Sequence, residues 1–355
     1  MKYAILAITK GATLLGEQLA GQLEADFFPC KGKLRTTLET VWTRYEGIIC
    51  IMATGIVVRT VAPLLKDKSK DPAVVVCDEH GKFAVSLLSG HLGGANALAE
   101  RVADATGGQA VITTASDVLG QTALDLWCRE LDLVIGNKTR FTQKMGKLVD
   151  TGSLQVYSRY PLPPLPPDLI QTETVESADL IITSLAEIQT DAALLHPKTL
   201  VFGIGCKRGT PAALIEQCIE ATCKKHNLAP QSIALIASIT LKQDEQGLLT
   251  AAAGKQLNLR FFTSEELNTV PGITASPTVL RVTGAKAVAE PAAMLAAGAT
   301  SLLVGKMKWQ GATTAVAEMP TLLQHNNKEI TTQHGALNTR KPTNSLCCRH
   351  WPRSS

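Results

Sequence analysis

The chain has 355 residues, of which 45% are apolar, 19% are charged and 4% are aromatic. This length suits two or three domains with real cores, and the shortage of aromatics argues against a nucleic-acid binder that stacks bases on aromatic side chains. The net charge of +4 lies entirely after Pro320, so the total implies no polyanion-binding surface on the rest of the chain.

Short apolar runs alternate with helical patterns in the first 136 residues. Residues 3–8 end at Lys10 and Gly11 without a signal-peptide cleavage site, which predicts a first strand, and a helix follows to about Leu23. We expect further strands at 47–52, 73–77, 83–88, 110–113 and 131–135, and helices at 95–105 and 122–130. Such alternation predicts an open, mostly parallel sheet with helices on both faces.

A proline-rich segment interrupts this alternation. Five prolines lie between Pro161 and Pro167, too many for a helix or a central strand. We therefore expect a linker or a small middle region over 137–198, with one strand candidate at 180–183.

The alternation resumes over 199–319 and then stops. We expect strands at 200–204, 234–239, 259–262, 279–282 and 301–304, and helices from Thr210–Pro211 to about 226 and over 287–297. Residues 320–355 show no periodicity, so we expect a disordered tail. The predicted fold class is α/β, with two open, mostly parallel, helix-covered sheets in domains 1–136 and 199–319.

Neither membrane insertion nor export is indicated. The longest apolar stretches, 47–58 and 292–305, fall short of the ~20 residues of a membrane-spanning helix. The nine cysteines form no disulfide framework, and Cys30, Cys50, Cys77 and Cys128 are widely spaced, as is typical of small buried side chains in a reducing compartment. We expect a cytoplasmic protein that binds neither membranes nor nucleic acid.

A glycine-rich turn holds the first candidate site. Gly90, Gly93 and Gly94 surround His91 between the expected strand 83–88 and the following helix. Glycines let the backbone approach a ligand, free N–H groups at a helix start can bind an anion, and a His can exchange a proton near neutral pH. The alternative is that His91 only hydrogen-bonds the backbone of the turn.

Two other strand ends carry candidate side chains. Gly55 follows one strand, and Arg59 lies near the start of a helix-like segment, where a guanidinium suits bidentate carboxylate binding; a plain surface Arg is equally compatible. Asp117 follows the strand at 110–113. It either orients His91 or caps the helix expected at Thr122.

Glycines also mark the loop after 200–204. Their spacing at Gly203, Gly205 and Gly209 misses the dinucleotide fingerprint by one residue. Lys207 and Arg208 within the loop favour anion binding instead, and Lys10 lies in a smaller loop of this kind. Because open parallel sheets bind ligands at the carboxyl ends of their strands, we expect all these loops at such edges.

No metal site is expected. The sequence has no H-E-x-x-H, no paired C-x-x-C and no phosphate-binding Walker loop. Cys218, Cys223 and His226 are spaced five and three apart, which does not place three ligands around one metal.

Together these loops resemble the CbiG family of cobalt-precorrin-5A hydrolases. The matching stretches, within about 1–317, are 53–99 with SGHLGGAN, and later VFGIGCKRGTP, ASITLKQDEQGL and AVAEPAAMLAAG. The resemblance implies opening of a δ-lactone on a cobalt-bearing macrocycle in anaerobic cobalamin biosynthesis, with release of acetaldehyde to give cobalt-precorrin-5B. Cobalt arrives with the substrate, so no cofactor is expected, and neighbouring enzymes of the pathway are possible partners.

This chemistry suggests roles for the candidate residues. We hypothesise that His91 is the general acid or base, that Asp117 orients it, and that N–H groups near Gly93 and Gly94 stabilise an oxyanion. The residues expected to bind the carboxylate-bearing substrate are Lys10, Gly55, Arg59, Gly90, Gly93, Gly94, Lys207 and Arg208. Residues expected to be structural or to frame the substrate are Lys242, Glu245, Glu290 and Lys306.

Three other functions stay open at this point. A macrocycle carrier without chemistry would use the same anion-binding loops. A methyltransferase of the same pathway and a nicotinamide oxidoreductase are disfavoured, because the glycine spacing does not form a convincing nucleotide loop.

Overall fold

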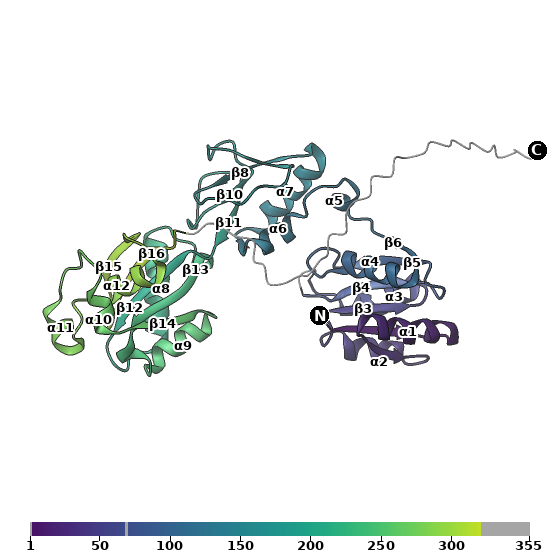
Figure 1. The fold of residues 1–355 in the computed structure, drawn as a ribbon, viewed down its shortest axis with the longest axis horizontal. Coiled ribbons are helices and arrows are strands. Elements are labelled where there is room, and N and C mark those ends of the chain that lie inside the picture. Colours follow the sequence, from purple (N-terminus) through teal and green to yellow (C-terminus); the bar gives the residue numbers. More distant parts are fainter. Residues whose placement is uncertain (1, 68–69, 321–355) are drawn as a thin grey trace, which may run out of the picture. The chain divides into compact units, whose positions relative to one another are not determined.

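A computed structural model describes residues 2–67 and 70–320. Three sheets follow one another along the chain, each built from one contiguous part (Figure 1). The α/β class is therefore confirmed, but the expectation of two sheets is wrong. The expected disordered tail lies outside the described residues. No helix in the described part of the chain combines the length and the apolar character needed to cross a bilayer.

The first sheet has six strands in the order β2-β1-β3-β4-β5-β6. Its strands are β1 (Tyr3–Ala7), β2 (Asp26–Pro29), β3 (Gly47–Ile51), β4 (Ala73–Cys77), β5 (Phe83–Leu88) and β6 (Gln109–Val111). The accompanying helices are α1 (Lys10–Leu23), α2 (Leu34–Val41), α3 (Thr54–Val61), the 3₁₀ turn η1 (Ala62–Leu64), α4 (Ala95–Thr106) and α5 (Ala115–Val118). β3 and β4 are buried on both faces, as their unbroken Ile- and Val-rich runs predict.

One hairpin reverses the direction of this sheet. β1 to β4 are parallel, β5 is antiparallel to β4, and β6 is parallel to β5. The carboxyl ends of β5 and β6 therefore lie at the edge opposite to the carboxyl ends of β1 and β3. All candidate loops follow the carboxyl ends of their strands, as expected, but in the first sheet these ends do not share one edge, because the short turn after β4 makes a hairpin and not a crossover.

The second sheet occupies the region expected to be a proline-rich linker. Its strands are β7 (Leu133–Ile135), β8 (Leu154–Ser158), β9 (Leu169–Gln171), β10 (Leu180–Ile182) and β11 (Ala193–Pro197), in the order β7-β11-β10-β8-β9. α6 (Leu124–Glu130) and α7 (Lys138–Thr151) accompany it. The prolines lie in the connection from β8 to β9, where no ladder hydrogen bond is needed. β7, predicted as a strand of the first sheet, pairs with β11 instead.

A buried histidine makes the stability of the second sheet pH-dependent. The His196 side chain on β11 is 2% exposed, its Nδ1 lies 2.9 Å from the Thr183 carbonyl oxygen, and burial lowers its pKa. The native state therefore holds His196 neutral, while the unfolded chain takes up a proton below about pH 6.5. Stability should fall as the pH drops from about 6.5 toward the lowered native pKa.

Urea unfolding at pH 7.5 and at pH 5 checks this expectation. The wild type should lose free energy of unfolding between the two, with a slope of at most about 1.4 kcal/mol per pH unit for one proton. His196→Gln should show a smaller loss over the same interval, because Gln does not titrate. Equal losses in both proteins would assign the pH dependence to other groups.

The third sheet has five strands in the order β14-β13-β12-β16-β15. They are β12 (Leu200–Cys206), β13 (Ile233–Ile239), β14 (Asn258–Phe262), β15 (Val304–Lys308) and β16 (Ala312–Glu318). The helices are α8 (Ala212–Lys225), α9 (Gln246–Gly254), α10 (Ser264–Asn268), α11 (Pro277–Thr283) and α12 (Ala289–Ala297), with the 3₁₀ turns η2 (Pro230–Ser232) and η3 (Thr240–Lys242). β12, β13 and β14 are parallel, and β16 runs antiparallel to both β12 and β15.

Two sequence predictions fail in this sheet. The strand expected at 279–282 lies inside helix α11, whose first residue is Pro277; four apolar-rich residues are too few to separate the two periodicities. The last strand was expected at 301–304, but β15 begins at Val304 and β16 follows it.

Candidate functional site

His91 and Asp117 meet at one edge of the first sheet. The His91 Nε2 atom lies 2.7 Å from the Asp117 Oδ2 atom. His91 lies in the loop from β5 to α4, and Asp117 lies on α5 after β6. Because β5 and β6 are parallel neighbours, their carboxyl ends place the two residues together. Asp117 does not cap α6, which starts after Ala123 without a side-chain cap.

A second carboxylate faces the other ring nitrogen of His91. The Nδ1 atom lies 3.5 Å from the Asp125 Oδ1 atom, and the His91 side chain is 9% exposed. The Ser116 hydroxyl also lies 3.3 Å from Nε2. The imidazole is therefore held between two acidic groups, an arrangement that fixes its orientation for proton transfer.

Asn96 binds the same oxygen of Asp117 that His91 contacts. Its amide nitrogen donates to Asp117 Oδ2 at 3.0 Å, and its carbonyl oxygen accepts from the Ser86 hydroxyl at 2.6 Å. Neither Asn96 nor Asp125 is among the site residues predicted from the sequence. The position of Asn96 at the end of SGHLGGAN, in the first turn of the expected helix, is a signal for the former, but nothing in the sequence connects Asp125 with His91.

The glycines of this loop have structural reasons of their own. Gly94 adopts φ 85° at the start of α4, a conformation that L side chains rarely take. A Cβ at Gly90 would lie 2.8 Å from the Asn96 side-chain oxygen, and a Cβ at Gly93 would overlap Ser89. The Gly94 N–H already donates to the His91 carbonyl oxygen at 3.0 Å. It is therefore not free for an oxyanion, which corrects this part of the hypothesis and leaves Gly93 as the candidate donor.

A cavity of about 460 Å³ opens beside the imidazole. Its lining comes from the His91 loop, from residues 122–125 and from Met145 and Leu148 of α7. The wall is mainly apolar, and the polar groups that line it include His91, Ser116 and Asp125. A proton donor or acceptor with a fixed orientation therefore faces a small, partly apolar space.

Lys10, Gly55 and Arg59 lie at the opposite edge of the first sheet. They follow β1 and β3, whose carboxyl ends point away from the His91 edge. Arg59 occupies the last turn of α3, not its start, and its guanidinium donates back to the Gly55 carbonyl oxygen at 2.9 Å. It lines a separate cavity of about 640 Å³ together with Lys31 and Arg35. The structure does not bring these residues to His91.

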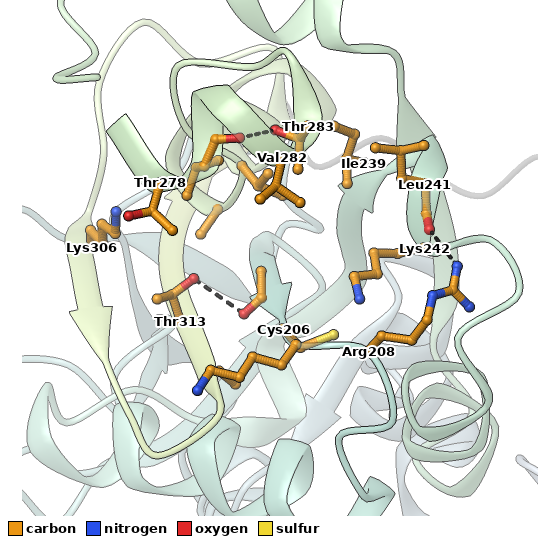
Figure 2. A pocket seen from close by; sticks show the side chains of 16 residues that line it. Cys206, Arg208, Ile239, Leu241, Lys242, Thr278, Val282, Thr283, Lys306 and Thr313 are labelled. Atoms are coloured by element: carbon orange, nitrogen blue, oxygen red, sulfur yellow. Dashed lines mark hydrogen bonds between the residues drawn. The ribbon is translucent and has the colours of Figure 1, made fainter. Parts of the chain in front are cut away.

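A third cavity, of about 590 Å³, lies at the carboxyl ends of β12 and β13. Lys207 and Arg208 line it, together with Lys242 and Lys306. Figure 2 shows Lys306 on one side, Lys242 and Arg208 on the other, and Val282 of α11 along the rim between them. We call this space the C-terminal pocket. Its charged lining residues are all cations.

Acidic neighbours engage two of these cations. Arg208 makes a bidentate pair with Asp244, with N–O distances of 2.9 and 3.0 Å. Lys242 pairs at 3.0 Å with Glu245, which is 3% exposed and also accepts the Gly209 N–H at 2.8 Å. Burial alone would raise the pKa of Glu245, but Lys242 and the Gly209 N–H outweigh it and lower the pKa.

Two other polar groups at the C-terminal pocket are structural or inert. Glu290 accepts the backbone N–H of Lys306 at 3.1 Å and so holds β15 against α12. Burial raises the pKa of Cys206, which keeps its thiol protonated at neutral pH and makes it a poor nucleophile.

Nothing in the described residues forms a group of three or more His, Cys, Asp or Glu side chains able to hold a metal. Cys218 and Cys223 are buried, and His226 Nε2 lies 3.5 Å from the Met307 sulfur. These residues pack and do not form a ligand set.

Two family profiles match the chain. The profile "Cobalamin synthesis G N-terminal" matches residues 36–117, and "Cobalamin synthesis G C-terminus" matches 200–317. The chain is 34% identical to a cobalt-precorrin-5A hydrolase from Priestia megaterium, covering 90% of this chain and 95% of that protein. It is also 34% identical to a cobalt-precorrin-5A hydrolase from Salmonella typhimurium, covering 82% and 91%. Protein CobE from Sinorhizobium sp is 33% identical over 35% of this chain and 82% of its own length. The His91 loop and the C-terminal pocket thus both fall within matched regions, and the chain belongs to the cobalamin biosynthesis protein G (CbiG) family.

Proposed function

We propose that this protein is a cobalt-precorrin-5A hydrolase, acting on a cobalt-bearing macrocycle in cobalamin biosynthesis. The observation that carries the proposal is the 34% identity to proteins of that name over almost their whole length. The hydrogen-bonded pair of His91 and Asp117, beside a cavity, supports an enzyme rather than a carrier.

The reaction is a hydrolysis that also breaks a carbon–carbon bond. Water adds to the lactone carbonyl and the ring C–O bond breaks, which gives a carboxylic acid and a hydroxyl group. Loss of the hydroxyl proton then forms the C=O of acetaldehyde, while the C–C bond to the macrocycle breaks. The electron pair stays on the macrocycle, which takes up a proton. One water is consumed, and no oxidant or reductant is needed.

Each step moves one proton, so one oriented imidazole can serve both. We propose that His91 removes a proton from the attacking water and returns one during breakdown of the lactone. Asp117 orients the ring through Nε2, which directs Nδ1 toward the Asp125 side of the cavity. The Gly93 N–H is our candidate donor to the developing oxyanion.

Substrate binding is divided over separate places. Gly90, Gly93 and Gly94 shape the His91 loop, whereas Lys207 and Arg208 line the C-terminal pocket. Our prediction that Lys10, Gly55 and Arg59 also bind substrate stays a proposal, now restricted to carboxylate arms that reach the opposite edge. Cobalt is part of the substrate, and we propose that no further cofactor takes part.

Three further expectations belong to this proposal. We propose that the enzyme acts in the cytoplasm, and that neighbouring enzymes of the pathway pass the macrocycle to and from it. We also propose the domain division 1–136, 137–198, 199–319 and 320–355, with the first boundary moved to a point before α6, because β7 pairs with β11 and Leu124 and Trp127 pack in the core of the second sheet.

Acetaldehyde release is the direct test of the activity. Incubation with the cobalt macrocycle bearing the intact lactone should release one acetaldehyde per macrocycle, trapped as a hydrazone and quantified. The yield should be unchanged after treatment of the protein with EDTA, because no resident metal takes part. Binding of the macrocycle without acetaldehyde would show a carrier, and loss of turnover after EDTA would show a bound metal.

A further inference from the structure

Two lysines of the C-terminal pocket, Lys207 and Lys306, make no ion pair within the described residues. No ion pair or side-chain hydrogen bond is shown for the ammonium groups of Lys207 and Lys306 within 2–67 and 70–320, in contrast to the paired Arg208 and Lys242. Lys207 is exposed and Lys306 is half-buried. An ammonium group with no acidic partner at the rim of a cavity suits a carboxylate from a ligand.

An apolar surface lies between the cations. Val282 is 70% exposed, and Ile239, Leu241, Val279 and Val288 continue the apolar lining. Val282 and Val279 belong to α11, and Leu241 belongs to the turn after β13. Exposed aliphatic side chains beside lysines form a surface for a ligand with an apolar body and anionic arms.

We propose that the C-terminal pocket binds the cobalt macrocycle through its carboxylate arms, with Lys207 and Lys306 as carboxylate partners and Val282 against the ring. This inference rests on the proposed function. The pocket lies on the third sheet, whereas His91 lies on the first, so the proposal separates residues that hold the arms from residues that move protons. Lys207 and Lys306 are then specificity residues for a polycarboxylate and not catalytic residues.

Charge complementarity is the argument for this occupant. All four charged lining residues are cations, and the acidic groups next to them, Asp244, Glu245 and Glu290, each have a partner within the fold. A neutral apolar ligand would leave the two lysines unused, and a small anion would leave the apolar wall exposed. A flat ring edged with carboxylates satisfies both.

Absorbance titration with a cobalt corrin whose arms are free carboxylic acids tests the proposal in the full-length protein. Lys306→Met keeps the aliphatic stem and removes the charge, and we expect it to raise the Kd about tenfold, as for loss of one charge-assisted hydrogen bond. Lys207→Met should raise it similarly. Val282→Ser, at an exposed position where misfolding is not expected, should also weaken binding. The wild type should bind the same corrin with amidated arms about tenfold more weakly or worse.

A matched lysine supplies the control. Lys225 is exposed near the end of α8, away from the C-terminal pocket, so Lys225→Met should leave the Kd unchanged. Unchanged binding in both Lys306→Met and Lys207→Met, or an equal loss in Lys225→Met, would overturn the proposal. If the wild type binds through Lys306 but releases no acetaldehyde, the proposed activity fails and the binding site stands. If it releases acetaldehyde while binding ignores Lys306, the activity stands and the site fails.

Discussion

His91→Ala should abolish acetaldehyde release while the folded protein still binds the macrocycle. General acid–base catalysis by a positioned side chain contributes about 10²–10⁴-fold, so turnover should fall at least about 100-fold. The Kd should change little, because the carboxylate arms are held by lysines on another sheet. Single-turnover acetaldehyde release gives the first quantity and absorbance titration gives the second. Turnover within about twofold of the wild type would remove His91 from the mechanism.

Two further variants, Asp117→Asn and His80→Ala, help to separate a loss of catalysis from structural damage. His91→Ala leaves the carboxylates of Asp117 and Asp125 facing an empty space, so its circular dichroism and melting temperature must be compared with those of the wild type. Asp117→Asn keeps the shape of that side chain and removes its charge, so turnover should fall by less than in His91→Ala. His80 is an exposed histidine in the turn after β4, and His80→Ala should retain full activity.

Among the parallel strands of the first sheet, sequence patterns predicted β1, β3 and β4 but not β2. β3 and β4 occur within one residue of the predicted bounds, because buried strands are short, continuous runs rich in Ile and Val. The direction of β5 was not predicted. Direction depends on whether a connection is a tight turn or a crossover, and the four residues at 79–82 contain no helix that could bring the chain back.

That single reversal decides which candidate residues meet. His91 and Asp117 come together because both follow strands on the reversed side of the hairpin. Lys10 and Arg59 follow strands on the other side of the hairpin, so they lie at the opposite edge of the sheet and do not belong to this site. A sequence gives the order of the loops, whereas the edge at which each loop lies is a property of strand direction.

In the middle region, 137–198, the sequence fails to predict most of the strands themselves and not only their direction. The five strands of the second sheet have three to five residues each, and the three shortest are β7, β9 and β10. The sequence predicts β7 and β10, as the strands at 131–135 and 180–183, but not β8, β9 or β11, because runs of three to five residues carry little periodicity and the neighbouring prolines favour a linker. Their sheet is stabilised by contacts distant in sequence, as in the antiparallel pairing of β7 with β11.

The glycine spacing of the third sheet also had a different cause from the one we inferred. Gly209 adopts φ 77° and belongs to the loop, as an anion-binding reading requires. Gly203 instead lies within β12 beneath α12, where a side chain has no room. The glycines of this spacing therefore have two different causes: a turn at Gly209 and a close helix–strand contact at Gly203.

Gly203→Ala should strongly destabilise the third sheet. A Cβ there would overlap the Ala289 carbonyl oxygen and lie 2.9 Å from the Ala293 nitrogen. Both are backbone atoms of α12, so no side-chain rotation can relieve the contact, and the helix must move away from β12. We expect a loss of about 3 kcal/mol, at the upper end of overpacking effects. The melting temperature should fall by about 6–12 °C, measured by calorimetry or circular dichroism.

The same substitution at Gly254 should slightly stabilise the protein. Gly254 is the last residue of α9, and its nearest neighbour to a new Cβ is the Glu216 Oε1 atom at 3.5 Å, an ordinary contact. Gly254→Ala should therefore raise the melting temperature slightly, because Ala favours helix over Gly by up to about 1 kcal/mol. Equal effects of the two substitutions would mean that α12 is not packed tightly on β12. In that case, close packing of α12 on β12 would not explain why AVAEPAAMLAAG is so rich in small residues.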